Sequence, residues 1–470
     1  MAQLYSNSKD QKKAVLFTVQ TKETSDSEND SSLQELTRLV TTMGLKVVGT
    51  VSQKRHYPSV STILGEGKLK ELARFTGGSG VVETYGKKNE VDDESDFDDD
   101  LDLDTDDHLD LEQSGQIATE ETASIVIYDG ELSPRQLKNL EQATSAEVLD
   151  RTGVILEIFS RHAKSPEAMI QVEIAKLVYL GPRLRMSRSG SDRQGGGIGS
   201  KGAGETSHEL DKRRIRDRIT ELKAKLVSIH AEQSRRRSRR KENCQIALVG
   251  YTNAGKSSLM RALTGSEVLV ADKLFATLDT RVRALFPVTF PNVLVSDTVG
   301  FIKKLPHDLV ASFQSTLDEA LAASVLLFTV DASDPDFRSQ LTVTQDVLSE
   351  IGAGDIPRKL VLNKIDKLSA AELQVLRAEY PEAIFISAHS PESVAELRTT
   401  ILDMFSGDMV ESTITFPFDK GQLLGQLRSK ASIIAESYDE HGTTVKIKTF
   451  PSVIEWAQKN LAEGKGQGQN

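Results

Sequence analysis

Residues 250–258 have the types and spacing needed to hold a chain of phosphate groups. The run Gly250-Tyr-Thr-Asn-Ala-Gly-Lys-Ser-Ser258 fits the pattern G-x-x-x-x-G-K-[ST] and lies between a predicted strand and a predicted helix. Its glycines let the backbone curl so that amide groups face phosphates, and the start of the helix adds positive potential. Lys256 can then bridge the β- and γ-phosphates, while Ser257 can ligate Mg²⁺. A chance glycine turn is the alternative, which the flanking strand and helix disfavour.

A second group of residues could serve the metal and the terminal phosphate. Asp297-Thr-Val-Gly300 directly follows the apolar run 293–296. The carboxylate of Asp297 can hold Mg²⁺ through a water molecule, and the backbone of Gly300 can sense the γ-phosphate. Thr277 lies between the phosphate loop and Asp297, where a further Mg²⁺ ligand is expected. Together with Ser257, these residues form the predicted metal site.

Two further motifs fit a guanine base. Asn363-Lys-Ile-Asp366 ends the apolar run 359–362, and the carboxylate of Asp366 offers two acceptors that match N1–H and the N2 amine of guanine. Adenine lacks that edge. Ser387-Ala-His389 follows the next apolar run, where a backbone amide can contact guanine O6. Because the carboxyl ends of parallel strands meet at one edge of a sheet, the ordered motifs predict a GTP site and a GTPase.

The sequence also predicts a limit on the chemistry. Phe301 follows Gly300, whereas many GTPases have a water-orienting glutamine at that position. Phenylalanine cannot polarise water, so intrinsic hydrolysis should be slow unless another loop or a partner completes the site. The expected catalytic residues are Lys256, Thr277 and Gly300. The expected nucleotide contacts are Gly250, Tyr251, Thr252, Asn253, Ala254, Gly255, Lys256, Ser257, Ser258, Phe275, Ala276, Thr277, Asp297, Thr298, Val299, Gly300, Asn363, Lys364, Asp366, Ser387, Ala388 and His389.

Alternating strands and helices should position these motifs. We expect a P-loop GTPase domain at residues 242–407, built on a doubly wound parallel sheet, and a small α+β domain at residues 411–464. The second domain is expected to have a helix around 423–435 and a strand at 443–448. The strand candidates of the GTPase domain are 246–249, 293–296, 325–330, 359–362 and 383–386.

A small α/β domain is expected at residues 1–160. Alternating apolar residues at 13–19 and 44–51 flank an amphipathic stretch at 32–43, which predicts strand, helix and strand. Further on lie an apolar run at 124–128, a helix-like stretch at 133–142 and another apolar run at 153–159.

An acidic insertion at about residues 88–118 interrupts this domain. It holds fourteen Asp or Glu residues between Glu90 and Glu112, so the rest of the chain is net basic although the whole carries −11. Such a run is expected to be a solvated, disordered spacer, because like charges repel, with an RNA mimic or a partner-binding tail as the alternatives.

Residues 161–241 predict a pair of long helices, over 166–184 and 210–229. The glycine-rich tip at 189–204 cannot hold a helix, so the pair should form an antiparallel hairpin. A solvated face is the ordinary interpretation of its basic residues, but sparse acids favour RNA binding by shape and charge. The basic residues are Arg188, Arg193, Lys201, Lys212, Arg213, Arg214, Arg216, Arg218, Arg235, Arg236, Arg237, Arg239, Arg240 and Lys241.

Composition excludes several classes of protein. No apolar run approaches the roughly 18 residues that span a bilayer, and the first residues have no apolar signal core. Cys244 is the only cysteine, which excludes an intrachain disulfide and a cysteine-based zinc site. We therefore expect a cytoplasmic protein without stable membrane insertion, with peripheral membrane association as an alternative.

Motifs outside the nucleotide site resemble those of HflX, a family of translation-factor-related GTPases, over nearly the whole chain. Two departures are the acidic insertion and the end of the glycine-rich loop, Gly199-Ser-Lys-Gly-Ala-Gly-Glu205, where the family usually has Arg and Pro. The resembling motifs are Ile63-Leu-Gly-Glu-Gly-Lys-Leu-Lys-Glu-Leu72, Glu131-Leu-Ser-Pro-Arg-Gln-Leu-Lys-Asn-Leu-Glu141, Asp150-Arg-Thr-Gly153, Gly195-Gly-Gly-Ile-Gly199 and Leu274-Phe-Ala-Thr-Leu-Asp279.

The resemblance implies a bacterial-type GTPase that binds the large (50S) ribosomal subunit and its rRNA in the GTP form, and splits stalled or idle ribosomes under stress. It also implies a hairpin that reaches toward the peptidyl-transferase region, weak ATP binding by the N-terminal domain and a monomer off the ribosome. Two other functions stay open. One is a GTP-dependent switch that binds a protein such as a protease or membrane assembly, and the other is an RNA remodeller with the N-terminal domain as its motor.

Overall fold

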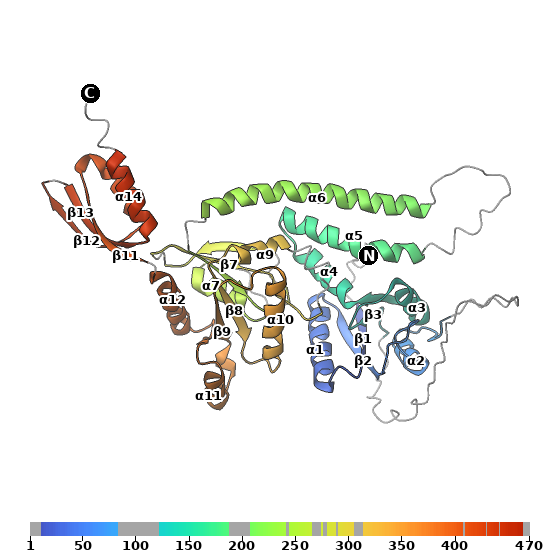
Figure 1. Ribbon diagram of the computed structural model, residues 1–470. Coiled ribbons are helices and arrows are strands. Elements are labelled where there is room, and N and C mark those ends of the chain that lie inside the picture. The colour runs from blue at the N-terminus through green and yellow to red at the C-terminus, as the bar shows by residue number, and fades with distance from the viewer. Residues whose placement is uncertain are drawn as a thin grey trace. The chain divides into compact units, whose positions relative to one another are not determined.

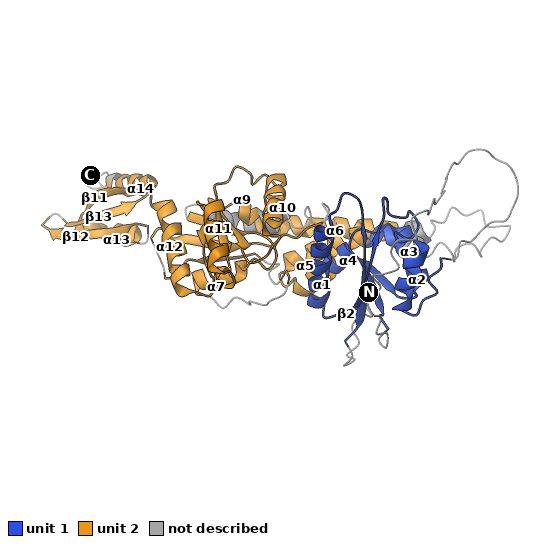
Figure 2. Cartoon of the chain, turned by 90° about the horizontal axis from the view of Figure 1, so that it is seen from below, with its two compact units in different colours: residues 1–155, 180–203 blue, residues 156–179, 204–470 orange. Residues whose placement is uncertain are grey.

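The computed structural model is shown in Figure 1. It divides the chain into two units, residues 1–155 with 180–203 and residues 156–179 with 204–470 (Figure 2). The acidic insertion, the glycine-rich tip, Ala276 and Thr277 lie outside the described residues. So do the side chains of the basic residues from Arg235 onward. The described residues are 11–82, 122–187, 207–240, 244–265, 274–275, 280–287, 290–304, 314–407, 409–428, 430–440 and 442–463.

A four-stranded parallel sheet in the order β2-β1-β3-β4 forms the N-terminal α/β domain. Ser25 and Glu28 form a capping box that starts its first helix. The rings of Phe17 and Tyr128 lie 4.8 Å apart in the core. The elements are β1 (Lys13–Gln20), α1 (Asp26–Thr42), β2 (Lys46–Lys54), α2 (Glu66–Arg74), β3 (Ile125–Tyr128), α3 (Pro134–Thr144) and β4 (Glu147–Asp150).

The apolar run at 153–159 is helical, within α4 (Arg151–His162), and the last strand of the sheet lies just before it. Asp150 fixes this change from strand to helix, because its carboxylate accepts the backbone N–H of Gly153 at 2.8 Å, at the start of the helix. The run is buried on all sides, with Ile155 and Phe159 almost wholly covered. A helix buried on all sides has no polar face, so its sequence resembles a buried strand.

The hairpin consists of α5 (Pro166–Ser187) and α6 (Ser207–Arg240). Arg218 pairs with Glu173 at 2.8 Å and His230 lies 3.2 Å from Glu167, so the two helices run antiparallel as predicted. Figure 1 shows them side by side. Within the described residues, no helix is long and apolar enough to cross a membrane.

A six-stranded sheet in the order β10-β9-β8-β5-β7-β6 forms the domain in which a GTP site is expected. Five strands are parallel as predicted, but β6 at the edge is antiparallel to β7. This strand has only four residues, so its alternation of arginine with small apolar residues was not recognised as a strand. The elements are β5 (Cys244–Val249), α7 (Lys256–Thr264), β6 (Arg281–Ala284), β7 (Val293–Asp297), α9 (Gln314–Leu321), β8 (Val325–Asp331), α10 (Phe337–Glu350), β9 (Arg358–Asn363), α11 (Ala370–Glu379), β10 (Ile384–Phe385) and α12 (Pro391–Ser406).

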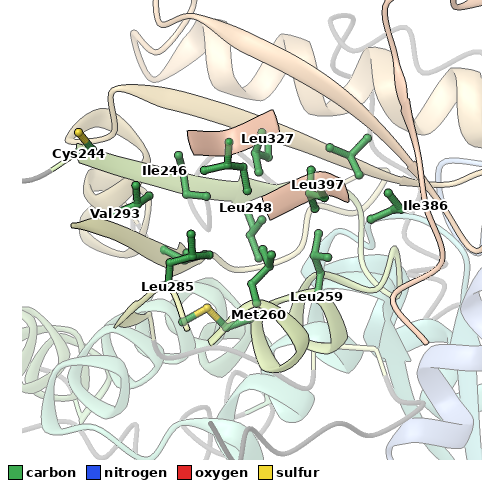
Figure 3. Close-up of a cluster of buried hydrophobic side chains, with 14 of the residues drawn as sticks. Cys244, Ile246, Leu248, Leu259, Met260, Leu285, Val293, Leu327, Ile386 and Leu397 are labelled. Atoms are coloured by element: carbon green, nitrogen blue, oxygen red, sulfur yellow. The ribbon is translucent and has the colours of Figure 1, made fainter. Parts of the chain in front are cut away.

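The core of this domain lies between the sheet and the helices that cover it. Ile246 and Leu248 of β5 belong to one buried cluster with Leu259 of α7 and Leu397 of α12 (Figure 3). Burying such side chains contributes roughly 1.5–3 kcal/mol each, which holds β5 and α7 in a fixed relation. The loop between these two elements is therefore anchored at both ends.

The C-terminal α+β domain has an antiparallel sheet in the order β11-β13-β12. The helix expected at 423–435 ends at Arg428, and residues 432–439 form a strand instead. Ile433 pairs with Ile447, so sheet packing overrides the apolar pattern that favoured a longer helix. The elements are β11 (Val410–Phe416), α13 (Gly421–Arg428), β12 (Ser432–Asp439), β13 (Gly442–Thr449) and α14 (Pro451–Glu463).

Candidate nucleotide site

The phosphate loop joins β5 to α7 and depends on two glycines. Gly250 has φ of +149°, and a Cβ there would lie 2.1 Å from the carbonyl oxygen of Thr329. Gly255 has φ of +92°, and a Cβ there would lie 2.2 Å from the side-chain nitrogen of Asn363. Only glycine fits both positions. No side chain caps the start of α7 at Gly255, as suits a helix whose first amides face an anion.

Lys256 is buried within this loop. Its ammonium donates to the carbonyl oxygens of Gly250 at 3.0 Å and Tyr251 at 2.7 Å. Burial lowers the pKa of Lys256 to about 8, against the opposing effect of the nearby Asp297 carboxylate. A poorly hydrated ammonium that gains a phosphate partner regains its preference for the charged form. The arrangement therefore favours an anionic ligand at Lys256.

Ser257 and Asp297 come from neighbouring elements. Asp297 ends β7 opposite Leu248 of β5 and is wholly buried. The hydroxyl of Ser257 donates to its carboxylate at 2.8 Å. A hydroxyl and a carboxylate side by side are hard oxygen ligands, which suit Mg²⁺ that is also bound by phosphates. Among the described residues, no group of three or more His, Cys, Asp or Glu side chains could hold a metal alone.

Gly300 and Phe301 lie against the phosphate loop. Phe301 N–H donates to the Gly250 carbonyl at 3.1 Å, and Thr252 N–H donates to the Phe301 carbonyl at 2.8 Å. A Cβ on Gly300 would lie 2.9 Å from Thr252 Cα and 3.0 Å from the ammonium of Lys256. Any side chain at Gly300 would therefore displace the loop.

The neighbours of Gly300 have structural contacts of their own. Thr298 donates its hydroxyl to the Leu248 carbonyl at 2.8 Å, within the sheet. Val299 is buried. Tyr251 accepts the backbone N–H of Lys303 at 2.6 Å, which ties the first part of the phosphate loop to this segment.

The segment that carries Thr277 is described only at Leu274 and Phe275. Phe275 is buried, with a left-handed φ of 57°. Its ring meets that of Phe159 edge-on at 4.6 Å. Its side chain is thus committed to packing, which leaves its backbone as the part that could meet a nucleotide.

The predicted base contacts come from two adjacent strand ends. Asn363 is buried and links them, because its side-chain nitrogen donates to the Ala254 carbonyl at 3.0 Å and its oxygen accepts Ala388 N–H at 3.1 Å. Asp366 is exposed, and a hydrogen bond from Ser387 keeps its pKa below the ordinary value. An ionised, exposed carboxylate can accept two donors from a base.

Asp331 is a site residue that sequence reasoning missed. It ends β8, and its carboxylate pairs with the ammonium of Lys364 at 2.7 Å. Lys364 also donates to the Asn253 carbonyl at 2.8 Å, so the pair braces the phosphate loop. The available signal was its place at a strand's carboxyl end, beside the other motifs.

Four of the predicted motifs thus meet at the carboxyl edge of one sheet, in loops after β5, β7, β9 and β10. Strands β7 and β8 flank β5 on opposite sides. The carboxyl end of β5 is therefore the topological switch point of the sheet, which is where ligands bind in open α/β sheets. Fold and site together define a P-loop GTPase.

Comparison with known proteins identifies the family. Residues 245–364 match a family model described as 50S ribosome-binding GTPase, residues 162–240 match the GTP-binding GTPase middle region, and residues 30–82 and 110–160 match the GTP-binding GTPase N-terminal region. The GTPase HflX of Gluconacetobacter diazotrophicus is 51% identical over 96% of this chain and 98% of its own length. That of Escherichia coli K12 is 34% identical over 90% of each chain. The chain belongs to the HflX family of GTPases.

The solved structures that resemble this chain include more distant proteins. A GTP-binding protein from Sulfolobus solfataricus in complex with GDP is 23% identical, with a TM-score of 0.42 over 83% of this chain and 99% of that chain.

Proposed function

We propose that this GTPase binds the large ribosomal subunit and its rRNA in the GTP form, and separates stalled or idle ribosomes under stress. The match of residues 245–364 to a family described as 50S ribosome-binding is the observation that carries the proposal. Full-length similarity to GTPases named HflX supports it. The proposal extends to action in the cytoplasm, weak ATP binding by the N-terminal domain and a monomeric state off the ribosome.

Exposed cations on α6 support contact with RNA. Arg213, Arg214 and Arg216 are exposed, and Arg218 is paired with Glu173 and Glu221. Arg214 forms a weak ion pair with Asp211 at 3.5 Å, and 79% of its side chain is exposed. A surface ion pair of this kind contributes little, so these guanidinium groups can exchange it for phosphates.

The same proposal includes Mg²⁺ and the roles of the site residues. Ser257, Asp297 and Thr277 would hold the ion, which supplies charge neutralisation for the phosphates when bound. Lys256 would bind the β- and γ-phosphates and Gly300 the γ-phosphate, while Asp366 would accept the guanine edge. The other nucleotide contacts and the domain boundaries that were predicted from the sequence are part of the same proposal.

A pelleting experiment tests the ribosome proposal. Protein loaded with a non-hydrolysable GTP analogue should sediment with purified 50S subunits at low salt, and GDP-loaded protein should stay largely in the supernatant. The triple variant R213E/R214E/R216E should weaken pelleting by at least about tenfold, because three phosphate contacts are lost and three like charges are added. The hydrolysis of GTP by the free variant serves as the folding control.

Two results would count against the proposal. One is analogue-loaded protein that does not pellet, while a protein partner is captured instead, which would favour the regulatory switch. The other is pelleting that is equal with GTP analogue and GDP, together with equal binding to any polyanion. That result would show that α6 is a non-specific basic surface.

A further inference from the structure

Thr252 carries a buried hydroxyl that the GTP-site assignments above do not use. The residue is 7% exposed, and its hydroxyl oxygen forms no hydrogen bond within the described part of the chain. A buried hydroxyl without a partner is unfavourable, and valine would fill the same volume without that cost. A polar group held in this way suggests a ligand that supplies the missing partner.

The backbone of Thr252 is fixed by the segment that contains Phe301, the residue found where many GTPases have a water-orienting glutamine. Its N–H donates to the carbonyl of Phe301 at 2.8 Å, and the adjacent Tyr251 forms a parallel bridge with Phe301. The side chain of Phe301 is buried and offers no polar atom. This segment therefore holds Thr252 in place, while the side chain of Phe301 cannot orient water.

Thr252 also lies at the terminal-phosphate end of the loop. A Cβ built on Gly300 would come within 2.9 Å of Thr252 Cα and Cγ2, and within 3.0 Å of the Lys256 ammonium. Thr252, Gly300 and the Lys256 ammonium thus lie close together, and two of them, Gly300 and Lys256, are the groups assigned to the γ-phosphate. The hydroxyl of Thr252 is on the same carbon as the Cγ2 methyl that lies near Gly300, so a rotation about the Cα–Cβ bond can bring it to a phosphate oxygen or a water at this place.

We propose that Thr252 is a catalytic residue, whose hydroxyl accepts a hydrogen bond from the water that attacks the γ-phosphate. The proposal rests on the assignment of Lys256 and Gly300 to the terminal phosphate. In the reaction, the water oxygen forms the new bond to the γ-phosphorus as the bond to the β–γ bridging oxygen breaks. The proton lost by water leaves on inorganic phosphate, and GDP carries the leaving oxygen. Thr252 holds the water in line and takes no proton.

The test compares Thr252→Val with Thr252→Ser. Valine keeps the volume but removes the hydroxyl, so single-turnover hydrolysis should fall roughly 10- to 100-fold, while affinity for GDP stays within about twofold. Serine keeps the hydroxyl and should restore the rate to within about threefold of the unaltered protein. Thr264→Val is the matched control: it removes a buried hydroxyl that donates to the Met260 carbonyl at 2.8 Å, and its rate should be unchanged.

Other outcomes would overturn the proposal. If Thr252→Val hydrolyses GTP at the unaltered rate and binds GDP normally, the hydroxyl has no part in catalysis. If it loses GDP affinity in proportion to its rate, or if serine fails to rescue, Thr252 has a structural role only. An error in the GTP-site assignment itself would give a different result, because the unaltered protein would then show no preference for guanine nucleotides.

Discussion

Replacing Asp366 with asparagine should weaken GTP binding by about 10²–10³-fold and shift the preference of the site toward xanthine nucleotides. The carboxylate can accept both N1–H and the N2 amine, and a hydrogen bond to a charged group contributes about 1.5–3 kcal/mol. Asparagine places an amide donor opposite one of those donors, so it loses one contact and adds a repulsion. Xanthine carries an oxygen in place of the amine and can accept from that amide.

Isothermal titration with GDP and with xanthosine diphosphate measures this change. Asp355→Asn is a matched control, since Asp355 is an exposed carboxylate in the same domain, between α10 and β9. It should leave both affinities unaltered. An Asp366→Asn protein that keeps its full preference for GDP would show that the base binds elsewhere.

Lys256→Ala should lower the rate of GTP hydrolysis by about 10²–10³-fold. The ammonium is buried and already aimed at backbone carbonyls of the phosphate loop, so it needs little reorganisation to meet developing negative charge. Its removal deletes the only Lys or Arg side chain of residues 250–258. Binding of GTP should weaken as well, by a smaller factor than the rate, because charge on the phosphate oxygens shifts as the reaction proceeds.

Single-turnover rates measured at saturating GTP separate these two effects. Lys359→Ala, which removes a lysine near the amino end of β9, should hydrolyse GTP at the unaltered rate. Thermal unfolding of Lys256→Ala without nucleotide checks that the loop's loss of two hydrogen bonds has not unfolded the domain. A Lys256→Ala protein with a normal rate would remove the phosphate loop from the chemistry.

Much of the site could be predicted because its chemistry restricts residue types. Gly250 and Gly255 occupy positions that only glycine tolerates, and the sequence shows this directly as a motif. Asp297 and Asp366 follow runs of buried residues, so the strand ends located them. The parallel sheet followed from the same runs, since strands buried on both faces have continuous apolar sequences.

Other features could not be predicted, since they depend on contacts far apart in the sequence. The partner of Asp331 is Lys364, and no local pattern joins the two. The helix at 151–162 begins because Asp150 caps it, although its buried residues resemble a strand. The strand β12 replaces an expected helix because Ile433 meets Ile447. The unpaired hydroxyl of Thr252 became visible only once its burial was known.

We expect one pocket to bind a guanine base and its phosphates together. Calorimetric titration of the unaltered protein in the presence of magnesium tests it most directly. GTP and GDP should bind at least about a hundredfold more tightly than ATP, because adenine offers no pair of donors to Asp366 and leaves that carboxylate without its partners. Equal uptake of ATP and GTP would contradict the account.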